Sequence, residues 1–199
     1  MLCNARSIKV ATVLIVGVFF SCSTEKHKSA GLYNVDSLFK TQIDYLIGHN
    51  ATINKKAKLN GREKVTTTNP KDSLAWNEEL AIFFELDIVN KPISKGTYKV
   101  EEYADNKSNL FVKSFTTTED LPVKFLKIYY QRSLSQLRKI EAQYNEANSL
   151  YSSKRFLTLE FESVYNKTIL TAYSIQGGQK MFLDDSVQYT IDANIVLKK

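Results

Sequence analysis

Apolar and polar residues alternate near the C-terminal end of this chain, and this alternation restricts the fold more than any other feature of the sequence. The apolar positions are Val187, Tyr189, Ile191, Ala193, Ile195 and Leu197, with Gln188, Thr190, Asp192 and Asn194 between them. Successive side chains of a β-strand point to opposite faces of its sheet, so the pattern predicts a strand with one dry and one wet face. Strands of this kind pair antiparallel when short turns join them.

The same two-residue period recurs from Thr97 onward, which predicts a curved antiparallel β-meander of about six or seven strands. The expected strands are 97–100, 110–115, 124–132, 155–163, 168–175, 180–183 and 187–197. Gly177-Gly178 is interpreted as a turn between two of them. Residues 134–151 fit a helix and a strand about equally, and their place within the meander favours a strand.

Two helix signals and one hairpin signal precede the meander. Asn34 can cap a helix that continues to Ile47. Asn60-Gly61 separates two alternating runs, and this dipeptide tolerates the positive φ angles of a tight hairpin turn. Asn69-Pro70 indicates the start of a second helix. Its apolar residues are Trp76, Leu80, Phe83, Phe84 and Ile88.

These patterns predict an α+β fold, in which N-terminal helices and a hairpin precede the curved meander. The helix around 76–88 carries so much apolar surface that we expect it to be buried on the concave face of the sheet. Some residues are expected either to form the core or to line an apolar cavity between helix and sheet. They are Trp76, Leu80, Phe84, Tyr189 and Ile191.

The first residues, MLCNARSIKVATVLIVGVFFSC, have the layout of a secretory signal. Arg6 and Lys9 precede an uncharged apolar run, 10–20, which is too short to span a bilayer comfortably. Small Ser21 then precedes Cys22. This box resembles a bacterial lipoprotein signal in the looser form found in the Bacteroidota. Two alternatives are a secretory signal cut further on, which would leave Cys22 an ordinary thiol, and an uncleaved membrane helix.

The resemblance implies that residues 1–21 are removed and that Cys22 becomes the acylated first residue. A tether over 22–31 would then join the anchor to a single domain over 32–199. Two or three acyl chains anchor a protein stably, which places the domain in the periplasm or at the cell surface. Cys3 would leave with the signal, so the mature chain could form no intrachain disulfide.

Charge and histidine content argue against several functions. The chain holds 27 Lys and Arg against 21 Asp and Glu, and losing Arg6 and Lys9 leaves 25 against 21, a net charge of +4. This mild excess does not favour nucleic acid. His27 and His49 lie apart and without evident partners, so we expect no catalytic histidine, metal or cofactor.

Carboxylate pairs at Glu101-Glu102, Glu160/Glu162 and Asp184-Asp185 offer weak candidates for acid–base chemistry or Ca²⁺ binding. Glu160 and Glu162 share the wet face of their strand, so a solvated pair is the preferred interpretation. The basic and aromatic run 124–132 could stack on a ligand or rest on lipid head groups. A strand that is half core and half solvated is the preferred interpretation of that run as well.

We therefore expect a non-enzymatic envelope lipoprotein that acts as a structural or accessory subunit, in contact with the membrane and with an envelope protein partner. The alternative is a periplasmic carrier or binding module for an acyl chain or other apolar ligand. The layout resembles the half-barrel lipoprotein-sorting and lipid-carrier proteins of the periplasm, although no motif supports that likeness. A roomy apolar cavity would favour the carrier, and a filled core with exposed apolar residues would favour the subunit.

Overall fold

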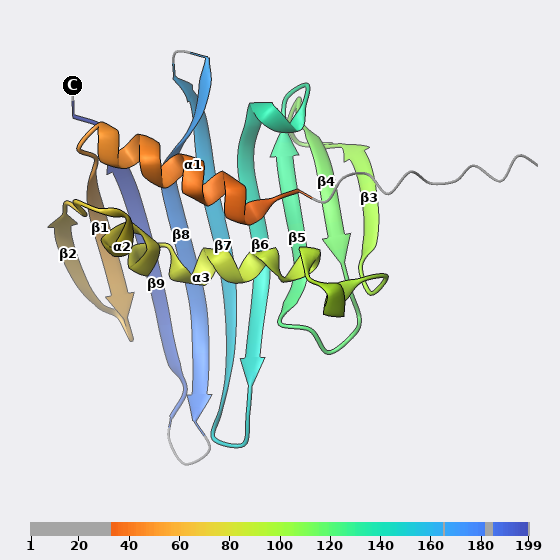
Figure 1. Ribbon diagram of the computed structural model, residues 1–199. Helices are drawn as coiled ribbons and strands as arrows, with labels where there is room; N and C mark the ends of the chain where they lie inside the picture. The colour runs from red at the N-terminus through yellow and green to blue at the C-terminus, as the bar shows by residue number, and fades with distance from the viewer. Residues whose placement is uncertain (1–32, 165, 182–184, 199) are drawn as a thin grey trace, which may run out of the picture. The chain divides into compact units, whose positions relative to one another are not determined.

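Nine antiparallel strands form one sheet, and the helices lie against one of its faces (Figure 1). The computed structural model describes residues 33–164, 166–181 and 185–198. The strand order is β2-β1-β9-β8-β7-β6-β5-β4-β3. The strands are β1 (Thr52–Leu59), β2 (Arg62–Thr68), β3 (Lys99–Ala104), β4 (Phe111–Thr116), β5 (Val123–Tyr130), β6 (Leu137–Ala147), β7 (Tyr151–Val164), β8 (Lys167–Met181) and β9 (Val187–Val196).

The helical segments are short and mostly precede the meander. They are α1 (Val35–Gly48), α2 (Ser73–Glu79), α3 (Ala81–Phe84) and the 3₁₀ turns η1 (Glu85–Asn90), η2 (Pro92–Ser94) and η3 (Leu134–Gln136). Asn34 caps α1 as expected, because its Oδ1 accepts a hydrogen bond of 2.7 Å from the backbone N–H of Ser37. The cap of α2 is Asp72 rather than Asn69. Asn69 instead donates to the carbonyls of Asn50 and Ala51.

The α+β prediction was wrong, because a single antiparallel sheet dominates the structure. Strands account for 52% of the described residues and helices for 23%. The N-terminal hairpin does not stand apart from the meander, since β1 pairs with β9 along its whole length. Residues 137–147 are also a strand, which confirms the preferred interpretation of that segment.

The long buried helix expected around 76–88 is divided into α2, α3 and η1. The fully buried side chains here are Trp76, Leu80, Phe83 and Leu86, and the later ones recur every third residue. A period of three matches a 3₁₀ turn, in which residues i and i+3 lie above one another. The expected helical spacing had selected Phe83 correctly, but it had also selected Phe84 and Ile88, which are only half-buried.

The core lies between the helices and the sheet. From α1, it takes Val35, Phe39, Ile43 and Leu46. From the central strands, it takes Leu126, Ile128, Ile140, Ala142, Leu157, Leu159 and Phe161. The buried Gln42 of α1 ties the helix to β8. Its Nε2 donates to the Thr168 carbonyl at 3.0 Å, and its Oε1 accepts from the Leu170 N–H at 2.7 Å.

The turn predicted at Gly177-Gly178 was wrong, because both residues lie inside β8. Gly177 pairs with Arg155 of β7 and Tyr189 of β9, and Gly178 pairs with Lys154 and Gln188. A Cβ on Gly177 would lie 2.7 Å from the Tyr189 hydroxyl oxygen and 3.0 Å from the Lys154 carbonyl oxygen. The glycine therefore permits a close approach between strands rather than a reversal of the chain.

Candidate functional site

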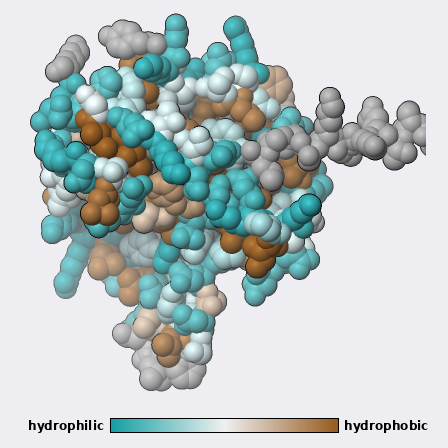
Figure 2. All heavy atoms as spheres, viewed as in Figure 1, coloured by the Kyte–Doolittle hydropathy of each residue, from teal (hydrophilic) through white to brown (hydrophobic). Residues whose placement is uncertain are grey.

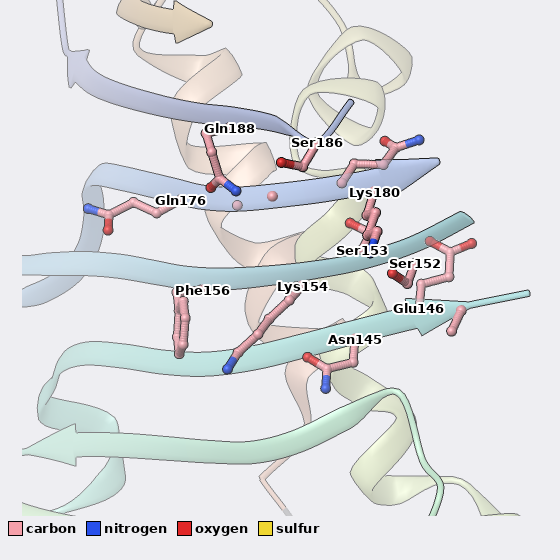
Figure 3. A pocket seen from close by; sticks show the side chains of 14 residues that line it. Asn145, Glu146, Ser152, Ser153, Lys154, Phe156, Gln176, Lys180, Ser186 and Gln188 are labelled. Carbon is pink, nitrogen blue, oxygen red and sulfur yellow. The ribbon is translucent and has the colours of Figure 1, made fainter. Parts of the chain in front are cut away.

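The outer face of the sheet, opposite the helices, carries a groove of about 600 Å³ across the ends of β6, β7, β8 and β9 (Figure 3). The outward positions follow from the register, because Leu157, Ile175 and Ile191 face the helices and their chain neighbours face outward. The residues that line the groove on this face are mostly polar. They include Asn145, Ser152, Lys154, Phe156, Gln176, Gly178 and Gln188.

Two cross-strand rows organise this face. The first row consists of successive register partners on neighbouring strands. It begins at Phe125 on β5 and continues through Gln143, Phe156, Gln176 and Thr190. In the second, Asn145, Lys154, Gly178 and Gln188 are partners in the same way. The first row therefore alternates between aromatic rings and amides from Phe125 to Gln176 and ends on Thr190. The second row has a bare glycine between a lysine and an amide.

Phe156 is a large apolar side chain on a polar face, and 44% of its surface is exposed. The Lys154 Nζ lies 5.0 Å from the centre of its ring. In Figure 3, Lys154 extends between Phe156 and Asn145. On β5, the Lys127 Nζ lies 5.5 Å from the ring centre of Phe125 in the same arrangement. Such cation–π contacts hold each lysine beside a ring whose remaining surface faces solvent.

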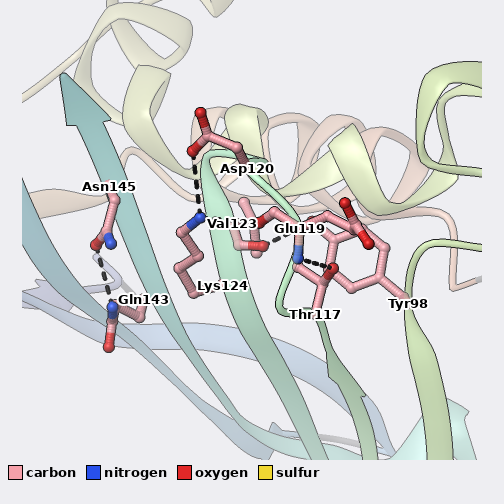
Figure 4. A network of polar contacts seen from close by, with 8 residues as sticks. All are labelled: Tyr98, Thr117, Glu119, Asp120, Val123, Lys124, Gln143 and Asn145. Atoms are coloured by element: carbon pink, nitrogen blue, oxygen red, sulfur yellow. Dashed lines mark hydrogen bonds and ion pairs between the residues drawn. The ribbon is translucent and has the colours of Figure 1, made fainter. Parts of the chain in front are cut away.

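The amides near the groove are held by neighbouring groups (Figure 4). The Gln143 Nε2 donates to the Asn145 Oδ1 at 3.1 Å. The Asn145 backbone N–H donates to the Pro122 carbonyl at 2.7 Å, which fixes the end of β6 against the turn before β5. Lys124 closes that turn by donating to the Glu119 carbonyl at 2.9 Å. The bond between the two amides uses the Gln143 Nε2 and the Asn145 Oδ1. The side-chain oxygen of Gln143, Oε1, and the side-chain nitrogen of Asn145, Nδ2, can therefore still bind a ligand.

Two charged clusters lie on the helix-covered face. Glu79 of α2 accepts a hydrogen bond from the Tyr173 hydroxyl and forms an ion pair of 2.6 Å with Lys55. Burial, together with the Glu79 carboxylate, holds the pKa of Tyr173 well above its usual range, so this hydroxyl acts as a donor. Lys113 is 1% exposed and pairs with Glu102 at 3.2 Å. Both clusters connect elements of the fold. Of their residues, Tyr173 alone lines one of the five pockets described, and the carboxylates and lysines of the clusters line none.

The residues predicted for the core or cavity occupy different environments. Trp76 and Leu80 are fully buried, and Phe84 and Ile191 are half-buried and packed against the core. Tyr189 lies outside that cluster, and its hydroxyl accepts a hydrogen bond of 3.0 Å from the Arg155 Nε. None of the five pockets described is lined by a residue of α2 or α3. A pocket of about 610 Å³ does lie between α1 and β8, where Gln42, Tyr45 and Ile169 line it.

The remaining candidates from the sequence do not converge on one site. Glu160 and Glu162 are both exposed, as expected for a solvated pair. Glu101 forms an ion pair with Lys99 at 2.8 Å. His49 stacks on Tyr45, with ring centres 4.0 Å apart. Among the described residues, no three His, Cys, Asp or Glu side chains are placed to hold a metal ion. Cys22, His27 and Asp184 lie outside those residues.

Sequence reasoning missed the outer-face groove, although one signal for it was present. Assigning Leu157, Leu159 and Phe161 to the dry face of their strand leaves Phe156 on the wet face. The same reasoning places Phe125 on the wet face of the run 124–132, where stacking on a ligand had been considered. Exposed rings on polar faces are informative, because most large apolar side chains are buried.

Comparisons with known proteins identify no relative. No family model, curated protein or solved structure matches this chain. A search of the described part of the chain for a helix of sufficient length and hydropathy to span a membrane finds none.

Proposed function

We propose that this protein is a non-enzymatic structural or accessory subunit of a bacterial cell envelope, held at the membrane by acylated Cys22. It would bind its partner through its surface rather than hold an apolar ligand inside. The observation that supports this function is the filled core between α2, α3 and the sheet, where none of the five pockets described opens. The pocket between α1 and β8 is lined mainly by polar side chains, among them Thr41, Asp44 and Lys167.

Aromatic side chains occupy that space. The ring centre of Phe39 lies 5.0 Å from that of Phe84 and 6.3 Å from that of Phe83. The ring of Phe83 in turn meets Tyr173 of β8 at 5.5 Å. An acyl chain needs a cavity of several hundred Å³ lined by apolar groups. Close-packed rings in this position favour the subunit over the carrier.

The sheet offers β3 as an edge for a protein partner (Figure 1). All six residues of β3 are exposed. Val100 and Tyr103 on this strand, and Phe111 at the start of β4, are 45%, 43% and 46% exposed. From the helix side, the hydrophobic residues visible at the surface form separate clusters among hydrophilic ones (Figure 2). An unpaired strand with apolar side chains can accept an extended segment of another protein as a further strand.

Site-specific photocrosslinking in the native membrane tests this function. A photoreactive residue in place of Tyr103 on β3 should give a covalent adduct with one envelope protein. The same residue in place of Val65, which is exposed on the opposite edge strand β2, serves as the matched control. Equal adducts at both edges, or none at Tyr103, would contradict the proposal.

Cys22→Ala should release the protein from the membrane or block its processing.

A further inference from the structure

We propose that the outer-face groove and the row Phe125, Gln143, Phe156 and Gln176 form a binding site for an extended, flat glycan, such as a β-1,4-linked chain lying across the strands. The site is on a different surface from the β3 edge. Its test is therefore independent of the proposed function.

The spacing of the row suits a repeating ligand. Neighbouring strands lie about 4.8 Å apart, so Phe125 on β5 and Phe156 on β7 are separated by about 10 Å across the sheet. A β-1,4-linked glycan is a ribbon whose successive rings are turned over, so the same ring face recurs at every second sugar. The alternation of ring and amide along the row can match that two-sugar repeat.

The side chains also have the chemistry that a sugar requires. The C–H groups of a pyranose face pack on an aromatic ring, and Phe156 offers an exposed one. Amides donate and accept at once, as hydroxyl groups do, and Gln176, Gln188 and Asn145 line the groove. A fatty acid would leave these amides without partners, which is costly.

The groove runs in the direction that such a chain would take. A second depression of about 300 Å³ continues from it toward the β1–β2 hairpin and shares Gln176, Gly177 and Gln188 with it. It also reaches Thr190 of the first row and Asn60 of the hairpin turn. Gly178 leaves room for the Gln188 side chain in the first depression, because a Cβ there would lie 2.6 Å from the Gln188 Nε2.

The balance of charge favours a glycan over a polyanion. Lys154 and Lys180 line the groove together with Glu146, and the other residues that line it are uncharged. The second depression adds one further cation, Lys58, and its other lining residues are uncharged. A nucleic acid or another polyanion would need an excess of cations along its path. The side chains of this groove are mainly suited to hydroxyl groups.

Isothermal titration calorimetry of the full-length, detergent-solubilised protein tests the proposal. The probes are cellohexaose and chitohexaose, with glucose as the single-ring control. We expect at least one hexasaccharide to bind and glucose to bind at least about tenfold more weakly, because a single ring contacts only part of the row.

Substitutions along the row test the site. Phe156→Ala should weaken binding of the hexasaccharide by about tenfold or more, and Phe125→Ala should also weaken it. Phe156→Tyr should retain binding, because the ring is kept. The matched control is Val65→Ala on β2, which should change nothing. Thermal unfolding of each variant verifies that it is folded.

Three results would overturn the proposal. One is the absence of binding by both hexasaccharides at millimolar concentration. Another is binding that Phe156→Ala leaves unchanged in a folded variant. The third concerns a variant with a photoreactive residue in place of Phe156. If that variant forms an adduct with another protein, and an excess of hexasaccharide does not reduce the amount of adduct, the groove is a protein-docking surface.

Discussion

Gly177 and Gly178 are adjacent in β8, and the structure predicts that alanine destabilises the protein clearly at Gly177 and hardly at all at Gly178. A Cβ on Gly177 would meet the Tyr189 ring at 2.8 Å and the Lys154 carbonyl oxygen at 3.0 Å. The carbonyl belongs to the paired backbone of β7, and the Tyr189 hydroxyl is held by Arg155. The carbonyl cannot withdraw without disturbing the sheet, and the Tyr189 ring can withdraw only by giving up its hydrogen bond with Arg155.

Gly178 has a more yielding neighbour. The three atoms nearest to its hypothetical Cβ all belong to the side-chain amide of Gln188. That amide ends a flexible side chain, which can rotate away from the new methyl group. Neither glycine has a positive φ, so alanine fits the backbone at both positions without strain. Alanine also reduces the conformational freedom of the unfolded chain, which favours the folded state.

The magnitudes follow from these two terms. Overpacking costs about 1–3 kcal/mol, and a strain-free Gly→Ala change stabilises by about 0.4–1 kcal/mol. Gly177→Ala should therefore lower the free energy of unfolding by about 1–2 kcal/mol. Gly178→Ala should leave it within about 0.5 kcal/mol of the wild type or raise it slightly.

Urea unfolding followed by circular dichroism measures both changes, with a constant m-value as the check that the unfolding transition is comparable. A double variant, Gly177→Ala with Tyr189→Ala, should recover part of the cost, because it removes one of the two obstructing groups. Equal destabilisation by the two alanines would refute the reasoning, since it would mean that the packing around these glycines differs from the structure.

Three further predictions concern the core and its titratable groups. Trp76→Ala should cost about 3–5 kcal/mol and Trp76→Phe clearly less, because the buried indole N–H has no hydrogen-bond partner to lose; chemical unfolding compares them. Gln42→Leu should cost about 1–3 kcal/mol by leaving the buried Leu170 N–H unpaired, and slow hydrogen exchange at that amide should be lost. Burial raises the pKa of Tyr98 from 10.0 to about 12. The stabilisation that comes from keeping this hydroxyl protonated is therefore complete below pH 10 and is lost as pH rises to about 12. In a series of unfolding measurements at alkaline pH, Tyr98→Phe should flatten this decline in stability.

Local signals in the sequence predicted much of the secondary structure. Asn60 and Gly61 have φ values of 44° and 86°, which confirms the tight turn expected between β1 and β2. A helix capped by Asn34 and continuing to Ile47 was expected, and α1 (Val35–Gly48) forms there with Asn34 as its cap. These predictions succeeded because each depends on a few neighbouring residues.

The errors arose where long-range packing decides the outcome. Gly177-Gly178 has the composition of a turn, yet these glycines are needed because Tyr189 and Gln188 of the neighbouring strand approach them closely. The pairing of β1 with β9 joins residues more than a hundred positions apart and carries no local signal. The row from Phe125 to Gln176 likewise exists only through the register of β5 to β8.

Native mass spectrometry of the protein purified from its own membrane tests the central claim most directly. We predict a chain that begins at acylated Cys22, carries no bound fatty acid or phospholipid, and retains a protein partner. Releasing that partner should leave the emission of Trp76 unchanged, because the core stays filled. A free Cys22 thiol in an intact membrane-bound chain, or a tightly bound lipid whose removal shifts the Trp76 emission, would contradict the account.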